Sequence, residues 1–359
     1  MLLLLATACS LPSPADTADA ADTETGDADT GDADTAADTD STDPFDGPCD
    51  AVTGTTSVFL VSRADPTVLV RPAGAPSDGA RAWAIAGPDA LDRYFLVDGD
   101  RLLRSVDDGC VWLDVGPADG IEHLYTAPNT DVLYAYRPES LRATTDGVTW
   151  NTLTAPLLRA PATLVIDPSD ADVLRGYGPD GLLTSRDGGA SWLPTPVPTG
   201  EDWANVAIDA ADIDRVAIVD RDLWVTTNGR DYTAYENGLD GGVTWDDGVL
   251  YALTTVYDGD GVVSKALTRS DDLGATFVDV PIGLGEEPGI YTYAAQGGVV
   301  VSAGYWYGGP DGSQGLIVVT DAAGSTVHRI DGYESGTGIA WADDRVIVAV
   351  TPRGVETDD

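Results

Sequence analysis

The chain has few basic residues. It has 60 aspartates and glutamates against 19 lysines and arginines, a formal net charge of -41, and Lys265 is its only lysine. A surface of this sign repels phosphate backbones and anionic headgroups, so nucleic acid is not expected as a partner. Residues 1–50 contain 13 acids and no base, which leaves 47 acids and 19 bases elsewhere, a net of -28. The body of the protein is therefore acidic in its own right.

Histidine and cysteine are also scarce. The two histidines, His123 and His328, form no cluster with cysteine at metal-ligand spacing, so neither a metal centre nor a cofactor is predicted. The sequence also lacks a G-x-S-x-G elbow and a phosphate-binding glycine loop. These patterns predict no catalytic residue.

No segment after the N-terminal end approaches 18 uninterrupted apolar residues, so nothing else is expected to span a membrane. The chain begins MLLLLATAC, in which a leucine run and three small residues precede Cys9. This resembles the signal of bacterial lipoproteins, which are cut before such a cysteine and lipidated on it. The resemblance implies a signal segment over residues 1–9 and an exported lipoprotein at the outer membrane or cell surface, anchored by lipid alone. The alternative is a leucine run that is not cleaved.

Residues 10–48 are a degenerate Asp-Thr-Ala-Gly repeat with one aromatic residue, Phe45. This composition cannot bury enough apolar surface to form a core, so a disordered linker is predicted. As a random coil it would span about 35 Å from end to end, and repulsion between its charges would extend it further. Cys49 and Cys110 remain for the exported body over residues 49–359, where a disulfide is permitted but not established by the sequence.

The body consists of short apolar runs, such as RYFLVDG and RVAIVD, separated by Gly, Pro and Asp. Such runs predict an all-β domain. An octapeptide recurs as SVDDGCVW (105–112), TTDGVTW (144–150, one residue shorter), SRDGGASW (185–192) and SDDLGATF (270–277), with weaker copies at 226–232 and 320–327. Successive copies end 38, 42, 40, 45 and 50 residues apart, a period typical of propellers or solenoids.

Three apolar strands precede or lead into each octapeptide and a fourth follows it, which indicates a four-stranded antiparallel blade. The two ends of the chain, SVFLVSRADPTVLVRP and GIAWADDRVIVAV, each supply two strands that together would close a further blade. We therefore predict a β-propeller with seven four-stranded blades, with six or eight as alternatives.

The octapeptide resembles the Asp-box, S-x-D-x-G-x-T-W, of the BNR-repeat propellers, which include sialidases, sortilin-type ectodomains and photosystem assembly-factor-like proteins. The Ser and Asp side chains of such a turn bond its backbone, its Gly adopts a positive φ, and its aromatic residue packs beneath it. The resemblance implies that these turns are structural and lie away from the ligand face. The residues concerned are Ser105, Asp107, Gly109, Trp112, Asp146, Trp150, Ser185, Asp187, Gly189, Trp192, Ser270, Asp272, Gly274 and Phe277.

The sequence favours a monomeric, non-catalytic binding module for a glycan or a protein. Aromatic rings beside carboxylates suit sugar rings or cationic peptides, and the candidates for ligand contact are Tyr305, Trp306, Tyr307, Trp203 and Trp245. Their alternative role is packing between blades. The alternative function is a glycoside hydrolase, sialidase-like or other, which would need converging arginines or two opposed carboxylates on the propeller face.

Overall fold

The structure, a computed structural model, describes residues 49, 56–72, 74–76, 82–138, 140–156, 158, 163–198, 204–236, 239, 241–258, 261–280, 288–309 and 312–353. All of these belong to one compact unit, Asp43–Asp359. The predicted signal segment with Cys9 and the predicted linker lie outside the described residues. Within the described part, no helix has the length and apolarity needed to cross a bilayer.

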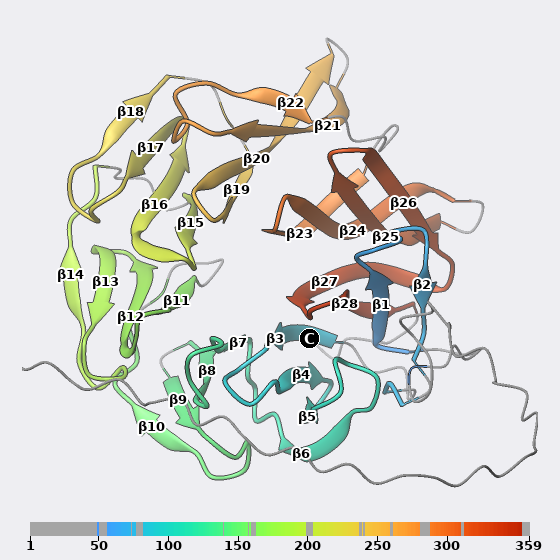
Figure 1. Cartoon of the computed structure of the whole chain (residues 1–359), viewed down its shortest axis with the longest axis horizontal. Helices are drawn as coiled ribbons and strands as arrows, with labels where there is room; N and C mark the ends of the chain where they lie inside the picture. Colours follow the sequence, from blue (N-terminus) through green and yellow to red (C-terminus); the bar gives the residue numbers. More distant parts are fainter. Residues whose placement is uncertain are drawn as a thin grey trace, which may run out of the picture. The chain divides into compact units, whose positions relative to one another are not determined.

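The described elements are β-strands in seven four-stranded antiparallel sheets, arranged in a ring (Figure 1). The chain is a seven-bladed β-propeller, which confirms the predicted fold and blade number. Three blades are β3 (Ala82–Ala86), β4 (Tyr94–Asp98), β5 (Arg101–Ser105), β6 (Leu113–Pro117); β7 (His123–Tyr125), β8 (Leu133–Arg137), β9 (Ser140–Thr144), β10 (Asn151–Leu153); and β11 (Leu164–Asp167), β12 (Asp170–Gly178), β13 (Gly181–Ser185), β14 (Leu193–Thr195).

Three further blades follow in chain order. They are β15 (Asn205–Asp209), β16 (Asp212–Asp220), β17 (Asp222–Thr226), β18 (Thr233–Tyr235); β19 (Gly242–Asp246), β20 (Val249–Asp258), β21 (Gly261–Ser270), β22 (Val278–Val280); and β23 (Pro288–Gln296), β24 (Val299–Gly309), β25 (Gly312–Asp321), β26 (Gly324–Ile330).

The seventh blade joins the two ends of the chain. It contains β27 (Tyr333–Trp341), β28 (Arg345–Pro352), β1 (Val58–Ser62) and β2 (Leu69–Val70) in the order β2-β1-β28-β27. β1 pairs antiparallel with β28, with Leu60 opposite Ile347. These are the strands predicted to close the ring, so the N- and C-terminal segments hold each other in one sheet.

The second strand of a blade is buried on both sides because neighbouring blades cover both faces of its sheet. All five residues of β4, YFLVD, are buried. Alternate side chains point to opposite faces, so Leu96 joins a cluster with Leu60 of the closing blade, while Phe95 joins one with Leu133 of the next blade. Full burial of one such side chain contributes about 1.5–3 kcal/mol. The core is therefore a series of interfaces between blades.

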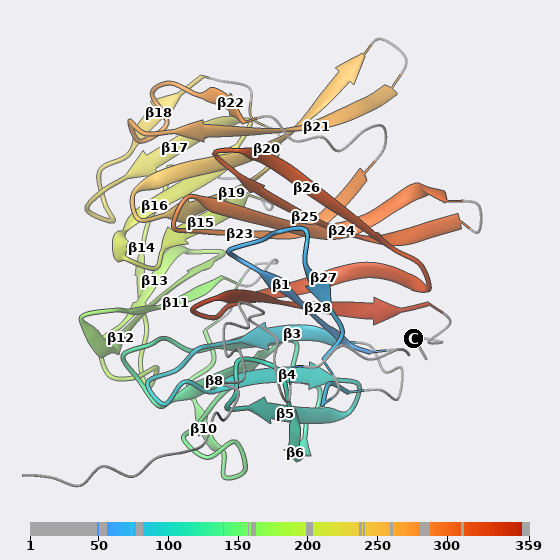
Figure 2. The same ribbon diagram turned by 45° about the vertical axis from the view of Figure 1, so that its right-hand side comes forward.

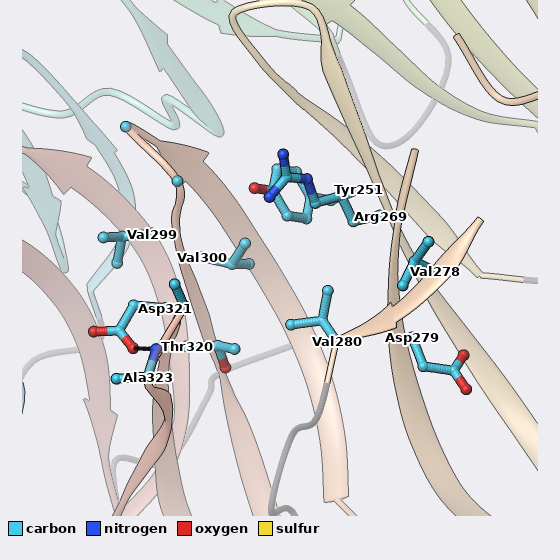
Figure 3. Close-up of a pocket in the computed structure, with 13 residues that line it drawn as sticks. Tyr251, Arg269, Val278, Asp279, Val280, Val299, Val300, Thr320, Asp321 and Ala323 are labelled. Atoms are coloured by element: carbon cyan, nitrogen blue, oxygen red, sulfur yellow. Dashed lines mark hydrogen bonds between the residues drawn. The ribbon is translucent and has the colours of Figure 1, made fainter. Parts of the chain in front are cut away.

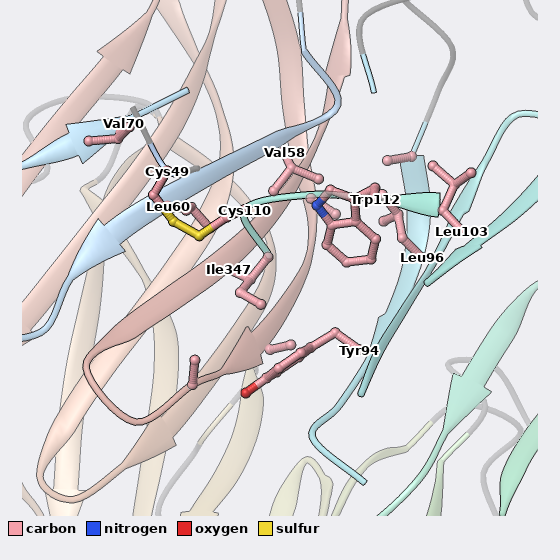
Figure 4. Close-up of a cluster of buried hydrophobic side chains, with 14 residues drawn as sticks. Cys49, Val58, Leu60, Val70, Tyr94, Leu96, Leu103, Cys110, Trp112 and Ile347 are labelled. Atoms are coloured by element: carbon pink, nitrogen blue, oxygen red, sulfur yellow. A yellow bond between two sulfur atoms is a disulfide. The ribbon is translucent and has the colours of Figure 1, made fainter. Parts of the chain in front are cut away.

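A disulfide joins Cys49 to Cys110, whose Cα atoms lie 4.7 Å apart. Cys110 lies in the turn between β5 and β6, and the bond lies beside Leu60 and Ile347 in the apolar cluster that Figure 4 shows. Arg345 Nη1 donates to both sulfur atoms, at 2.7 Å and 3.1 Å. The chain that precedes β1 is thereby fastened to the adjacent blade.

Each full octapeptide forms the turn between the third and fourth strands of its blade. In the turn at 185–192, Ser185 Oγ donates to Asp187 Oδ1 at 2.8 Å and accepts from Gly189 N at 2.8 Å. The Asp187 carboxylate also accepts from Ser191 N at 2.8 Å and Ser191 Oγ at 2.6 Å. Gly189 has φ +90°. The hydroxyl and the carboxylate thus replace the backbone pairing that a longer strand would supply.

The other octapeptides repeat these bonds. Ser105 and Asp107, Thr144 and Asp146, and Ser270 and Asp272 form the same pairs, and Gly109, Gly147 and Gly274 have positive φ. The weak copy predicted at 320–327 is different. There β25 and β26 are joined by only two residues, and Asp321 pairs with Gly324 as the end of a tight hairpin. A continuous β ladder replaces the octapeptide turn, so that prediction was wrong.

Candidate functional site

Two hairpins are longer than the corresponding hairpins of the other blades. β20, β21 and β25 have ten residues each and β24 has eleven, whereas β4 and β5 have five. Turns between second and third strands lie on the side of the ring opposite the octapeptide turns. The additional length therefore projects from that side, here called the hairpin face (Figure 2).

Trp306 lies in the projecting part of β24, where it pairs with Gln314 of β25. The guanidinium carbon of Arg329, from β26, lies 4.5 Å from the centre of a Trp306 ring. Trp306 is half-buried and Arg329 is exposed. A cation over an aromatic face at an exposed site contributes about 0.5–1 kcal/mol. The arginine therefore holds the indole ring in a defined orientation at the hairpin face.

Hydrogen-bonding groups lie beside this ring. Gln314, opposite Trp306 in the ladder, donates through Nε2 to Oδ1 of Asp331, which directly follows β26. Residues opposite each other in a ladder share one face of the sheet. Trp306, Gln314, Arg329 and Asp331, here called the Trp306 strip, thus combine an aromatic plane with an amide, a cation and a carboxylate.

Sequence reasoning identified only the tryptophan of this strip. Gln314, Arg329 and Asp331 are 8 to 25 positions away along the chain and carry no motif. No sequence pattern placed Gln314 opposite Trp306, because the ladder between β24 and β25 shifts its register between Trp306 and Gly309. Arg329 lies in β26 and Asp331 directly follows it, so their positions beside Trp306 depend on how β26 pairs with β25. That register is set by the tight β25–β26 hairpin, which the sequence did not predict.

The other predicted ligand residues do not join the strip in the described part. Tyr305 lies on the opposite face of its strand, over Gly289, where a Cβ would lie 2.1 Å from Tyr305 Cζ. Trp203 and the side chain of Tyr307 lie outside the described residues.

Trp245 is a packing residue. Its side chain is 6% exposed and clusters with Ala207 and Leu250 between two blades. Its Nε1 donates to the carbonyl of Ala207 at 3.2 Å, so its polar atom is used inside the interface. The alternative role that the sequence allowed, a wedge between blades, applies to this residue, and it presents no ring to a ligand.

A hollow of about 420 Å³ lies on the octapeptide side between the blades β11–β14 and β15–β18. Arg175, Arg186 and Arg230 line it, and Arg175 Nη1 lies 2.6 Å from Asp214 Oδ1. No sequence pattern predicted this convergence, because the three arginines come from two blades. Among the described residues, no group of three or more His, Cys, Asp or Glu side chains is placed to hold a metal ion.

No protein-family model matches the sequence, and no curated protein matches it either. Solved propellers are similar in fold. The structure of YCF48 bound to a D1 peptide has a TM-score of 0.52 and 12% identity, over 84% of this chain and 99% of that one. An ancestral GH74 enzyme has a TM-score of 0.52 and 12% identity, over 83% of this chain and 46% of that one. The chain thus spans about half of the GH74 enzyme. These similarities place the chain among the β-propellers.

Proposed function

We propose that this protein is a non-catalytic binding module of the Asp-box type, which holds a neutral glycan at the Trp306 strip. The observation that carries the proposal is the placement of the Arg329 guanidinium 4.5 Å over Trp306, beside the hydrogen-bonded Gln314 and Asp331. The Arg329 guanidinium covers one face of the indole ring, so in this proposal the other face packs against the apolar C–H face of a sugar ring, and the polar groups around it bond the hydroxyl edge. The net charge of -41 disfavours acidic glycans.

The ligand site would be carried at the bacterial envelope. In this proposal Cys9 bears the lipid, residues 10–48 act as a flexible acidic spacer, and the propeller is a monomer at the outer membrane or cell surface. Metabolic labelling with a palmitate analogue tests the anchor. The wild-type chain should take up label and remain in the membrane fraction, and Cys9→Ser should do neither. Equal labelling of both would contradict a lipid on Cys9.

A glycan array with the purified chain tests the ligand. Wild type should bind a subset of neutral glycans, and Trp306→Ala should bind them at least ten-fold more weakly. Trp192→Ala is the matched control, since it removes a half-buried tryptophan from the opposite side of the ring. Equal binding by wild type and Trp306→Ala would show that the Trp306 strip is not the glycan site.

A peptide is the alternative ligand, since an aromatic ring beside a carboxylate also suits a cationic segment. A library of basic peptides applied to the same three proteins distinguishes the two classes.

Incubation of the chain with the glycans that it binds tests for hydrolysis. New reducing ends formed in proportion to protein concentration would contradict the non-catalytic function and support a glycoside hydrolase.

A further inference from the structure

Among the described residues, the interface between the blades β19–β22 and β23–β26 lacks a covering turn that the other interfaces have. In the other six blades, six or seven described residues join the third strand to the fourth. Between β25 and β26 there are two, Ala322 and Ala323. Asp321 Oδ1 accepts from Ala323 N at 2.7 Å and Gly324 N at 3.1 Å, which closes this short turn on itself.

Elsewhere the turn of one blade covers the third and fourth strands of the preceding blade. Trp192 packs with Leu141 of β9 and Leu153 of β10, and a Cβ on Gly189 would lie 3.1 Å from Leu153 and 3.3 Å from Leu141. The same arrangement places other aromatic residues on their preceding blades: Trp112, Trp150, Tyr232 and Phe277. An aromatic side chain is thus the usual occupant of this position.

The blade β19–β22 presents the matching surface without that occupant. Val280 lies three residues after Phe277, as Leu153 lies three residues after Trp150, and Leu267 matches Leu141 at three residues before the end of its strand. The next blade has Val327 where the octapeptides have their aromatic residue, and Val327 packs on Leu316 and Val318 of its own sheet.

A pocket of about 560 Å³ occupies this position. Val278 and Val280 of β22 lie on one side, Val300 and Thr320 lie on the other, and Tyr251 also lines the pocket (Figure 3). Val300, Thr320 and Tyr251 are buried among their neighbours, which fixes the walls. The pocket is therefore a preformed space with mostly apolar walls, on the side of the ring opposite the Trp306 strip.

We propose that this pocket binds an aromatic side chain, presented on a peptide turn of a partner protein, in the manner of the missing octapeptide. Five other interfaces of the ring fill the corresponding space with a Trp, Tyr or Phe from a turn, so a side chain of the same kind fits this one. Arg269 lines the pocket beside Tyr251 (Figure 3), and Asp279 and Asp321 lie at its edge. Two carboxylates against one cation favour a neutral or weakly basic segment around the aromatic residue.

The probe is the chain's own turn supplied in trans. Capped peptides SRDGGASW and SRDGGASA are titrated into the full chain and followed by nuclear magnetic resonance. The tryptophan peptide should bind with a dissociation constant of about 1 mM, typical of one anchored side chain. Its indole protons should show Overhauser contacts to the methyl groups of Val280 and Val300. The alanine peptide should bind at least ten-fold more weakly.

Val280→Trp, which places a ring of the chain's own in the pocket, should abolish the binding. Leu113→Trp is the matched control, because it adds the same ring at an exposed strand residue of another blade, and it should bind like wild type. Binding unchanged by Val280→Trp, or an absence of methyl contacts in wild type, would overturn the proposal. The methyl contacts are measured in wild type, so a folding defect in the variant leaves the test valid.

Two further results would contradict the proposal that the occupant is a peptide turn of a partner protein. N-acetyl-tryptophanamide bound as tightly as the octapeptide would indicate a small aromatic ligand. A dimer of the wild-type chain that dissociates in Val280→Trp, measured by sedimentation velocity, would make the occupant a second copy of this protein.

Discussion

Arg93 and Asp89 form a buried ion pair that connects two blades. Arg93 Nη2 lies 2.5 Å from Asp89 Oδ2, and the side chains are 9% and 0% exposed. The same guanidinium donates to the carbonyl of Thr145 at 2.7 Å and that of Asp131 at 2.8 Å, both in the blade β7–β10. One arginine therefore neutralises a buried carboxylate and bonds the octapeptide turn of the neighbouring blade.

Replacement of Arg93 should destabilise the protein strongly. Arg93→Ala leaves the Asp89 carboxylate buried without its cation and leaves two carbonyls without donors, a loss of about 3–5 kcal/mol in the free energy of unfolding. Arg269→Ala is the control, because Arg269 and Asp271 are 45% and 63% exposed, and it should cost about 1 kcal/mol or less. Denaturant unfolding measures both. Similar losses in the two variants would contradict the interblade role of Arg93.

The octapeptide carboxylates should make the stability of the fold depend on pH in the acidic range. The side-chain and backbone bonds from Ser191, followed by that from Ser185, lower the pKa of Asp187 below its ordinary 3.8. The stabilisation is thus fully present above about pH 4 and is lost as the pH falls through the folded-state pKa. Asp187→Asn should lower the thermal midpoint at pH 7, and the difference from wild type should shrink toward pH 2.

Asp180→Asn provides the comparison for that series. Asp180 is an exposed carboxylate in the β12–β13 turn, on the opposite side of the same blade. Its replacement should leave the thermal midpoint nearly unchanged at both pH values. A constant difference between wild type and Asp187→Asn from pH 7 to pH 2 would show that the charge of Asp187 contributes nothing to the turn.

His123 should make the fold less stable in mild acid. Burial lowers the pKa of this imidazole from 6.5, against the opposing effect of Glu122. The unfolded chain therefore binds a proton before the folded one does, and stability decreases as the pH falls below about 6.5. The loss is about 1.4 kcal/mol for each pH unit between the two pKa values. Unfolding free energies at pH 7.5 and 5.5 should differ less for His123→Gln than for wild type; an equal difference would contradict this role.

Loss of the Cys49–Cys110 bond should lower stability. The bond closes a loop with a sequence separation of 61, which corresponds to about 4 kcal/mol from the reduced entropy of the unfolded chain. Cys110→Ser should lower the unfolding free energy by an amount of that order, and a thiol reductant should have the same effect on wild type. Reductant should not alter Cys110→Ser further. A midpoint unchanged by reductant in wild type would contradict a stabilising disulfide.

The order and approximate size of the blades could be predicted from the chain because they depend on local patterns. Alternating apolar runs predict strands, and the recurring Ser-x-Asp-x-Gly turn bonds itself through neighbours two to four residues away, as Ser185, Asp187 and Gly189 do. Pairing of the two ends could also be expected, since four strands without partners remained. The tight β25–β26 hairpin was missed because Thr-Asp and Gly-Ser resemble the octapeptide, although their ladder continues.

The sequence alone determined that short strands repeat at a near-constant period, because strand propensity and turn bonding are local properties of adjacent residues. Only the tertiary structure decided what lies between the blades. The burial of Trp245, the position of Arg329 over Trp306 and the uncovered pocket beside Val280 each join residues from different strands or blades. Such contacts depend on register and on packing between sheets, which the order of residues along one strand does not encode.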